Sequence, residues 1–458
     1  MLARSLLCSS MSTSYVSYHP EQQQLLPPAL QDWLPQGHLA YFISDTVDSL
    51  DLRAFHARYG SGGSRNQPLH PAMMVKVLVY AYATGVFSSR KIARKLHEDI
   101  AFRVLAADNF PAHRTIRDFR AQHLGEFTEL FTQVVRLARE MGLVKLGTIA
   151  VDGTKIKANA SRHKAMSYAR MQTTEAELKA QIAALLHKAA HTDEAEKNEP
   201  ELDIPAELER RQARLAAIEE AKARLQARQA QTDTQRGRSP GDGRKPRDKD
   251  GKPKGGRPYK RDFGTPEPKA QSSFTDPDSR IMKRAGGGFD YQYNAQTAVD
   301  ETAHIIVAAE VVNTSTDVQQ LPMVLDAVQA HTGAQPAQAL ADAGYRSEAV
   351  MSQLAKAYPA TELVIALGRE GKARATTPNP KDANRYPHTV AMAAKFQTEQ
   401  TQKDYRKRKW IAEPPNGWIK NVLGFRQFSM RGLEKAKAEF KLVCMALNLR
   451  RMGAVQAG

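Results

Sequence analysis

The chain has 458 residues, of which 41% are hydrophobic and 25% are charged. This composition is typical of globular proteins, and the length predicts two to four domains at roughly 100–200 residues each. No apolar run approaches the ~18 residues of a membrane span, which excludes an integral membrane protein. Two cysteines, Cys8 and Cys444, are too few for a disulfide scaffold or a cysteine-rich zinc module, so we expect an intracellular protein.

The chain is strongly basic, because 66 Lys and Arg residues against 49 Asp and Glu residues give a net charge of +17. The excess is uneven, since residues 236–285 and 401–458 together contain all of it. A concentrated positive charge indicates a polyanionic partner such as nucleic acid. A charge that serves only solubility is the alternative.

The first 30 residues are polar and predict a flexible N-terminus, whereas residues 31–145 have a helical pattern. Apolar residues recur at helical spacing after Pro71, and shorter helices follow. A helix, a tight turn and a second helix carrying Arg90, Lys91 and Arg94 resemble a helix-turn-helix unit. We therefore predict an all-α DNA-binding domain over 31–145, with an ordinary solvated basic face as the alternative.

The next segments predict one strand followed by a long insertion. The apolar run 146–151 reads as a buried strand that ends at Asp152. Residues 162–235 carry two apolar helical stripes with prolines between them, which predicts an antiparallel helical hairpin. Residues 236–285 are rich in Gly, Pro, Lys and Arg, which predicts a basic disordered arm beside a nucleic-acid path, or else a plain solvated linker.

Regular structure returns after residue 286 with alternating strand and helix patterns. Together with 146–161, residues 286–452 predict an α/β domain with a mixed sheet and helical crossovers. The expected strands are 291–299, 304–312, 338–341 and 362–366. The expected helices are 317–330, 348–355, 409–422 and 433–452, with a loop over 369–400.

Three acidic residues stand out by position. Asp152 and Asp342 each end a predicted strand, and Glu413 begins a predicted basic helix. Sites in open α/β sheets form at strand ends, and carboxylates gathered at one point are stable there mainly with hard cations such as Mg²⁺ or Mn²⁺. Two such ions clamp the attacking and leaving oxygens of phosphoryl transfer. Singly, each residue is better explained as a turn or helix-terminal carboxylate, but the combination predicts metal-dependent phosphodiester chemistry.

Several segments resemble the DDE transposases of bacterial insertion sequences. The resemblance covers most of residues 30–452, apart from the insertion and the arm. It is carried by HPAMMVKVLVYAYATGVFSSRKIARKLHEDIAFRVLA with HRTIRDFR, by TIAVDGTKIKANAS, by FDYQYNAQTAVD with VNTSTDVQQLPMVL, by LADAGYRS, and by the segment from YRKRKWIAEPPNGWIK to the basic C-terminal helix.

The resemblance implies an RNase H-like catalytic core whose DDE triad, Asp152, Asp342 and Glu413, holds two Mg²⁺ or Mn²⁺ ions. The Tyr, Arg, Glu and Lys signature around the glutamate would fall on Tyr405, Arg408, Glu413 and Lys420. The interval from Arg408 to Glu413 is one residue longer than in the best-known version. Asn416 stands where many relatives have an aromatic residue.

The implied function is metal-dependent cleavage and strand transfer at insertion-sequence ends. The implied partners are the terminal inverted repeats and target DNA, bound by a homodimer or multimer at the bacterial nucleoid in the cytoplasm. Arg408, Lys420, Arg426 and Arg431 are expected to contact DNA, whereas core packing explains Trp410 and Trp418 better than base stacking does. The rival predictions are a metal-dependent nuclease without strand transfer and a transposase-derived DNA-binding protein without activity.

Overall fold

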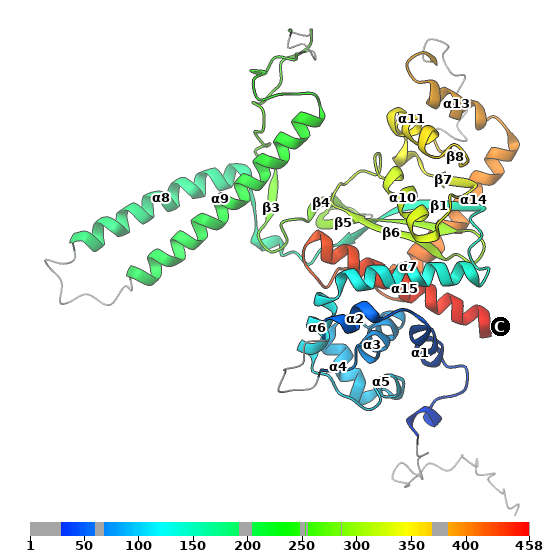
Figure 1. Ribbon diagram of the computed structural model, residues 1–458. Helices are drawn as coiled ribbons and strands as arrows, with labels where there is room; N and C mark the ends of the chain where they lie inside the picture. Colours follow the sequence, from blue (N-terminus) through cyan, green and yellow to red (C-terminus); the bar gives the residue numbers. More distant parts are fainter. Residues whose placement is uncertain are drawn as a thin grey trace, which may run out of the picture.

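The computed structural model shows a helical bundle, an α/β body and a long two-helix arm (Figure 1). Within the described part, none of the helices combines the length and apolar character needed to cross a membrane. The predicted flexible start lies almost wholly outside that part. The structure describes residues 29–59, 68–191, 204–247, 252, 255–284, 286–368 and 383–457.

The N-terminal region is all helical, as predicted. Helix α3 begins at Pro71, whose missing N–H is no loss in the first turn, and it is buried on nearly every side. The elements of this region are η1 (Leu30–Trp33), α1 (Leu39–Ser49), α2 (Arg53–Ala57), α3 (Pro71–Ala83), α4 (Ser89–Glu98), α5 (Ile100–Leu105), α6 (His113–Gln122) and α7 (Leu124–Glu140).

The body is built on a mixed six-stranded sheet, which is consistent with the expected RNase H-like core. Strands β1, β5 and β6 form an antiparallel meander, and β7 and β8 continue it in parallel with β1. Strand β4 pairs with the first residues of β5. The strands are β1 (Thr148–Lys157), β4 (Arg280–Lys283), β5 (Phe289–Asp300), β6 (Ile306–Val312), β7 (Gln338–Ala341) and β8 (Glu362–Ile365).

Helices cover this sheet and tie it to the N-terminal bundle. Helix α14 contacts β1, β5 and β7, whereas α10 and α15 contact β6. Helices α15 and α7 lie side by side between the sheet and the bundle (Figure 1), so the two regions share one hydrophobic core. These helices are α10 (Leu321–Thr332), α11 (Glu348–Ala357), α13 (Pro387–Lys395), α14 (Glu399–Gly417) and α15 (Leu433–Ala457), with the short turn η3 (Ala343–Tyr345) after β7.

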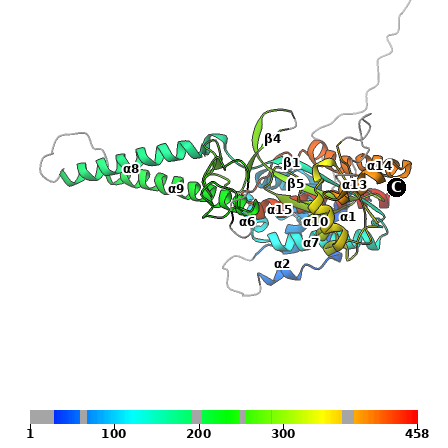
Figure 2. The same cartoon turned by 90° about the horizontal axis from the view of Figure 1, so that it is seen from above.

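The insertion after the first strand is the predicted helical hairpin. After the short turn η2 (Arg162–Lys164) and β2 (Ala165–Ser167), α8 (Tyr168–His191) and α9 (Ile204–Gln235) pack on each other and project from the body (Figure 1, Figure 2). They have a small core of their own, and β2 pairs with β3 (Gln271–Ser273) at their base. The core residues are Tyr168, Met171, Leu178, Ile218, Ala221 and Leu225.

Three expectations about local structure were wrong. The segment 236–285 is not structureless throughout, because β3 and β4 lie within it and are held by backbone hydrogen bonds to β2 and β5. The predicted loop over 369–400 contains α13, while 369–382 lies outside the described residues. The helix expected at 409–422 begins ten residues earlier, at Glu399, where Thr398 caps it.

Candidate active site

Asp152 and Asp342 lie at the same level of two neighbouring parallel strands. The register that pairs Ala150 with Leu340 brings Asp152 beside Asp342, since each lies two residues further along its strand. Asp342 follows β7 directly, as predicted. Asp152, however, does not end its strand, because β5 continues to pair with β1 as far as Lys157. The proximity therefore follows from the register of β1 and β7, not from the ends of two strands.

The Asp152 carboxylate is held from helix α14 at both oxygens. Arg408 Nη1 lies 3.4 Å from Oδ1, and Asn416 Nδ2 donates to Oδ2 at 3.2 Å. Asn416 also donates to Thr297 Oγ1 at 3.3 Å, which fixes its amide against β5. Burial raises the pKa of Asp152 above its ordinary value, and the Asp342 charge adds to this. Arg408 and the Asn416 hydrogen bond oppose the shift.

Asp342 is half-buried and has a second, structural role. Its Oδ1 accepts a hydrogen bond of 2.8 Å from the backbone N–H of Gly344, so it caps the short turn η3. The alternative explanation of Asp342 as a turn residue therefore applies to its Oδ1 atom. The negative charges of both aspartates act on Arg408. Burial alone would lower its pKa, but Tyr405, Asp152 and Asp342 raise it overall.

Helix α14 places the remaining predicted residues around this pair. Glu413 does not begin the helix. It lies in its last turns and is exposed, between Arg408 and Asn416 in the sequence. The helix continues through Pro414 and Pro415 into the π-helical turn η4 (Trp418–Val422), a distortion frequent at functional sites. Lys420, in that turn, has a pKa lowered by burial, and the charge of Asp152 opposes this shift.

A buried polar network behind the aspartates was missed by the sequence analysis. Asn294 Nδ2 and Gln296 Nε2 on β5 donate to Asp317 Oδ1 at 2.6 and 2.7 Å. Tyr345, just after Asp342, donates its hydroxyl to Gln296 Oε1. Asn294 and Gln296 continue an alternation of buried polar residues along β5 that begins with Asp290 and Gln292. Two polar residues at i and i+2 share a face, and that pattern could have revealed the network.

The residues fit a divalent cation in part. Asp152 and Asp342 provide two adjacent oxygen ligands, and Mg²⁺ is usually held by one or two carboxylates plus water and substrate phosphate. In the part of the chain that the structure describes, no group of three or more His, Cys, Asp or Glu residues is placed to hold a metal ion. The expected gathering of all three triad carboxylates is thus not seen, because Glu413 stays outside the aspartate pair.

The other predicted DNA contacts lie on exposed surfaces. On α4, Arg90, Lys91 and Arg94 are exposed, whereas Ile92 and Leu96 on the other face of that helix are buried. Arg426 and Arg431 are exposed near the end of η4, and Arg431 donates to the Asn159 carbonyl at 3.0 Å.

The expectation of a core role is wrong for one of the two tryptophans. Trp410 is 57% exposed and packs edge-on to His304. Trp418 is half-buried and packs against the main core, under the guanidinium of Arg450.

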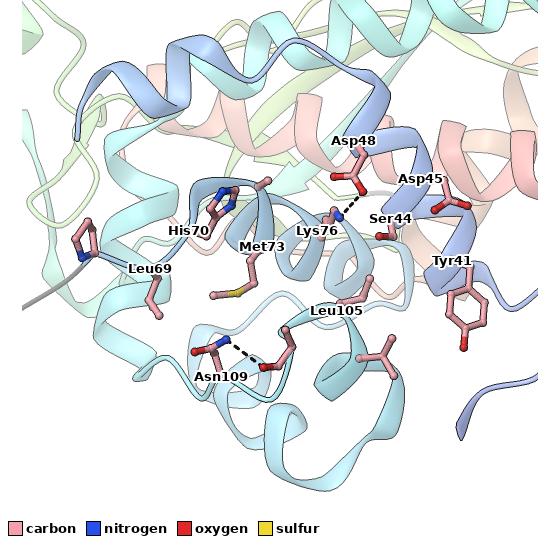
Figure 3. A pocket seen from close by; sticks show the side chains of 14 residues that line it. Tyr41, Ser44, Asp45, Asp48, Leu69, His70, Met73, Lys76, Leu105 and Asn109 are labelled. Atoms are coloured by element: carbon pink, nitrogen blue, oxygen red, sulfur yellow. Dashed lines mark hydrogen bonds and ion pairs between the residues drawn. The ribbon is translucent and has the colours of Figure 1, made fainter. Parts of the chain in front are cut away.

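A pocket in the helical bundle does not resemble a nucleic-acid surface. It lies between α1, α3 and the end of α5, and Asp45 and Asp48 face it (Figure 3). Lys76 is neutralised there by Asp48, with 2.6 Å between Nζ and Oδ2. Two carboxylates beside one paired lysine would repel phosphate, so the exposed face of α4 is the better candidate in this region.

Comparison with known families decides the identity of the chain. Residues 261–449 match the family described as transposase DDE domain, and residues 28–122 match the family described as transposase domain (DUF772). The chain belongs to the DDE transposases of insertion-sequence type. Such a domain generally belongs to an enzyme of the polynucleotidyl-transferase type. Asp342 and Glu413 of this transposase lie inside the matched DDE range, whereas Asp152 precedes it. No curated protein and no solved structure matches the chain.

Proposed function

We propose that the protein cuts DNA at the ends of an insertion sequence and joins the freed 3′-hydroxyl to target DNA. The observation that carries this proposal is the Asp152–Asp342 pair on neighbouring parallel strands, beneath a basic helix. Asp152, Asp342 and Glu413 are the catalytic residues. The same pair of aspartates supports both steps, because each step is an attack of an oxygen nucleophile on a phosphodiester.

The aspartates would hold one or two Mg²⁺ or Mn²⁺ ions, with Glu413 as the third carboxylate. Such an ion, when bound, stabilises charge on the attacking and leaving oxygens. Asn416 and Arg408 position Asp152 so that its oxygens keep one orientation. Lys420, on which the Asp152 charge acts, would bind the phosphate that reacts, and its partial burial would strengthen that attraction.

The DNA-binding surfaces follow from the distribution of charge. Arg90, Lys91 and Arg94 on α4 would contact a terminal repeat through its phosphates or groove, while Arg426 and Arg431 would contact DNA near the site. Two transposon ends must be held together for joining to one target. A homodimer or larger multimer on DNA is therefore part of this proposal, as is action at the nucleoid.

The test uses labelled DNA that carries the element's end, with Mg²⁺ or Mn²⁺. We expect Asp152→Asn, Asp342→Asn and Glu413→Gln each to lower cleavage by about a thousandfold or more, since each removes several kcal/mol of charge stabilisation. DNA binding should be largely retained. Normal strand transfer by any of these variants would overturn its assignment.

Pre-cut ends separate the rival functions. A nuclease would cut intact ends but not join pre-cut ones, and a DNA-binding protein derived from a transposase would do neither while still binding. The proposed transposase joins pre-cut ends in the same metal conditions that support cleavage. If Glu413→Gln alone keeps full activity, the catalytic site consists of the aspartate pair without the glutamate.

A further inference from the structure

A second basic site lies at the base of the arm. A cleft of about 990 Å³ opens between the end of α9, the β4–β5 hairpin and the loop that precedes Asp317. Arg228 on α9 and Arg280 on β4 line it, together with amide and hydroxyl side chains of the loop 313–316. Neither Asp152 nor Asp342 lines this cleft, so it is distinct from the candidate active site.

No carboxylate pairs directly with Arg228 in the described part of the chain, although Glu267 lines the cleft and the Asp278 charge acts on Arg228. Within the described residues, its half-buried side chain makes neither a hydrogen bond nor an ion pair, although the neighbouring Arg224 pairs with Glu220 at 2.5 Å. Burial, followed by repulsion from Arg280 and Arg224, lowers the pKa of Arg228 to about 10. Arg280 Nη1 is already committed to the carbonyl oxygens of residues 277–279. Holding an unneutralised guanidinium here costs stability, which an anionic ligand would offset.

The rim of the cleft offers an aromatic surface beside these charges. Phe289 is 64% exposed and Ile281 is 38% exposed, and both line the cleft. An exposed ring beside an unpaired guanidinium group is what a nucleotide needs, because the base stacks while the phosphate is neutralised. A free inorganic anion would gain nothing from the ring.

We propose that this cleft binds a DNA strand, with a phosphodiester between Arg228 and Arg280 and a base against Phe289. This inference rests on the proposed transposase function and adds a second DNA contact to it. Strand β5 links the two sites, because it runs from Phe289 to Thr297, which contacts Asn416 beside Asp152. Arg280 pairs with Gln292, and the five residues from there to Thr297 span about 17 Å, so the bound phosphate lies about five nucleotides from the reacting one.

The test compares Arg228→Gln with a matched variant of the same helix, Arg214→Gln. Arg214 is exposed and lies outside the cleft, about 21 Å from Arg228 toward the start of α9. Fluorescence anisotropy with a labelled duplex carrying the element's end gives the dissociation constant at several salt concentrations. We expect Arg228→Gln to weaken binding about 10- to 100-fold and to reduce the salt slope by about 0.9, whereas Arg214→Gln should change affinity by less than about threefold.

Thermal unfolding of the free protein separates ligand binding from a structural role. If Arg228 serves DNA, its replacement removes an uncompensated charge, so the midpoint of Arg228→Gln should stay equal or rise. Arg228→Lys should restore part of the affinity. Phe289→Ala, at an exposed position that folding does not require, should weaken binding about fivefold or more.

Two outcomes would overturn the proposal. One is wild-type affinity and salt slope in both Arg228→Gln and Phe289→Ala, and the other is a lowered unfolding midpoint of Arg228→Gln with unchanged affinity. Because the readout is binding, it is independent of cleavage. A protein that binds through Arg228 but never cuts DNA refutes the proposed function alone, whereas one that cuts DNA and binds normally without Arg228 refutes this inference alone.

Discussion

Glu439 joins the helical bundle to the α/β body through a buried charged network. The residue is 1% exposed on α15 and accepts hydrogen bonds from Tyr82 Oη at 2.9 Å and from the backbone N–H of Ser429 at 2.9 Å. Met430 donates a further backbone N–H at 3.2 Å, and Arg120 Nη1 lies 3.9 Å away. Burial and the Glu439 charge raise the pKa of Tyr82, which keeps its hydroxyl protonated as a donor.

Glu439→Gln should destabilise the protein by about 3–5 kcal/mol, the usual cost of breaking a buried charge pair from one side. The amide nitrogen of glutamine would face at least one donor that now meets a carboxylate oxygen. Each buried donor left without an acceptor costs about 1–3 kcal/mol, and the Arg120 charge loses its counter-ion. Local relaxation keeps the total below the sum of these costs.

Urea unfolding of Glu439→Gln, Arg120→Met and the double variant provides the measurement. The double variant should lose about 1–3 kcal/mol less than the sum of the singles, because the two groups interact. Glu434→Gln is the matched control on the same helix, since its exposed pair with Lys437 is worth less than about 1 kcal/mol. A loss below about 1 kcal/mol in Glu439→Gln, or strict additivity with Arg120→Met, would refute the reasoning.

Three further predictions concern single side chains. Asn416→Leu removes a hydrogen bond that lowers the pKa of Asp152, so the acid limb of the cleavage pH profile should shift to higher pH, and an unchanged profile in Mn²⁺ would contradict this. Asp276 is fully buried, and burial raises its pKa above the ordinary value of 3.8. Ionisation of Asp276 therefore lowers the free energy of unfolding when the pH is above that ordinary value. Asp276→Asn should therefore be more stable than wild type in urea at neutral pH, and this advantage should disappear as the pH falls through the raised pKa. Gly153→Ala would place a methyl group 2.6 Å from Gln296 Nε2 and should cost about 1–3 kcal/mol by thermal unfolding.

The sequence was sufficient for the aspartate pair because its signals are local. Each of Asp152 and Asp342 follows a short apolar run, and the parallel register of β1 and β7 brings the two residues to the same level, although β1 continues past Asp152. The start of α14 was not predictable in this way, because residues 399–409 are almost wholly polar and the prolines after Glu413 suggest a helix start. Strand β4 was missed because its four residues carry no long apolar run, and it is a strand only through its pairing with the neighbouring β5.

The position of Glu413 follows from helix geometry rather than from its sequence motif. At 100° per residue, Glu413 lies about 60° around α14 and 4.5 Å along its axis from Asn416, whose amide already touches Asp152. Residues three apart on a helix are neighbours, with Cβ atoms about 5–6 Å apart. Glu413 is therefore one helical turn from Asn416, but its own side chain is exposed and lies outside the aspartate pair. The extra residue between Arg408 and Glu413 explains this position, because it turns the glutamate away from the helix face that Arg408 and Asn416 occupy.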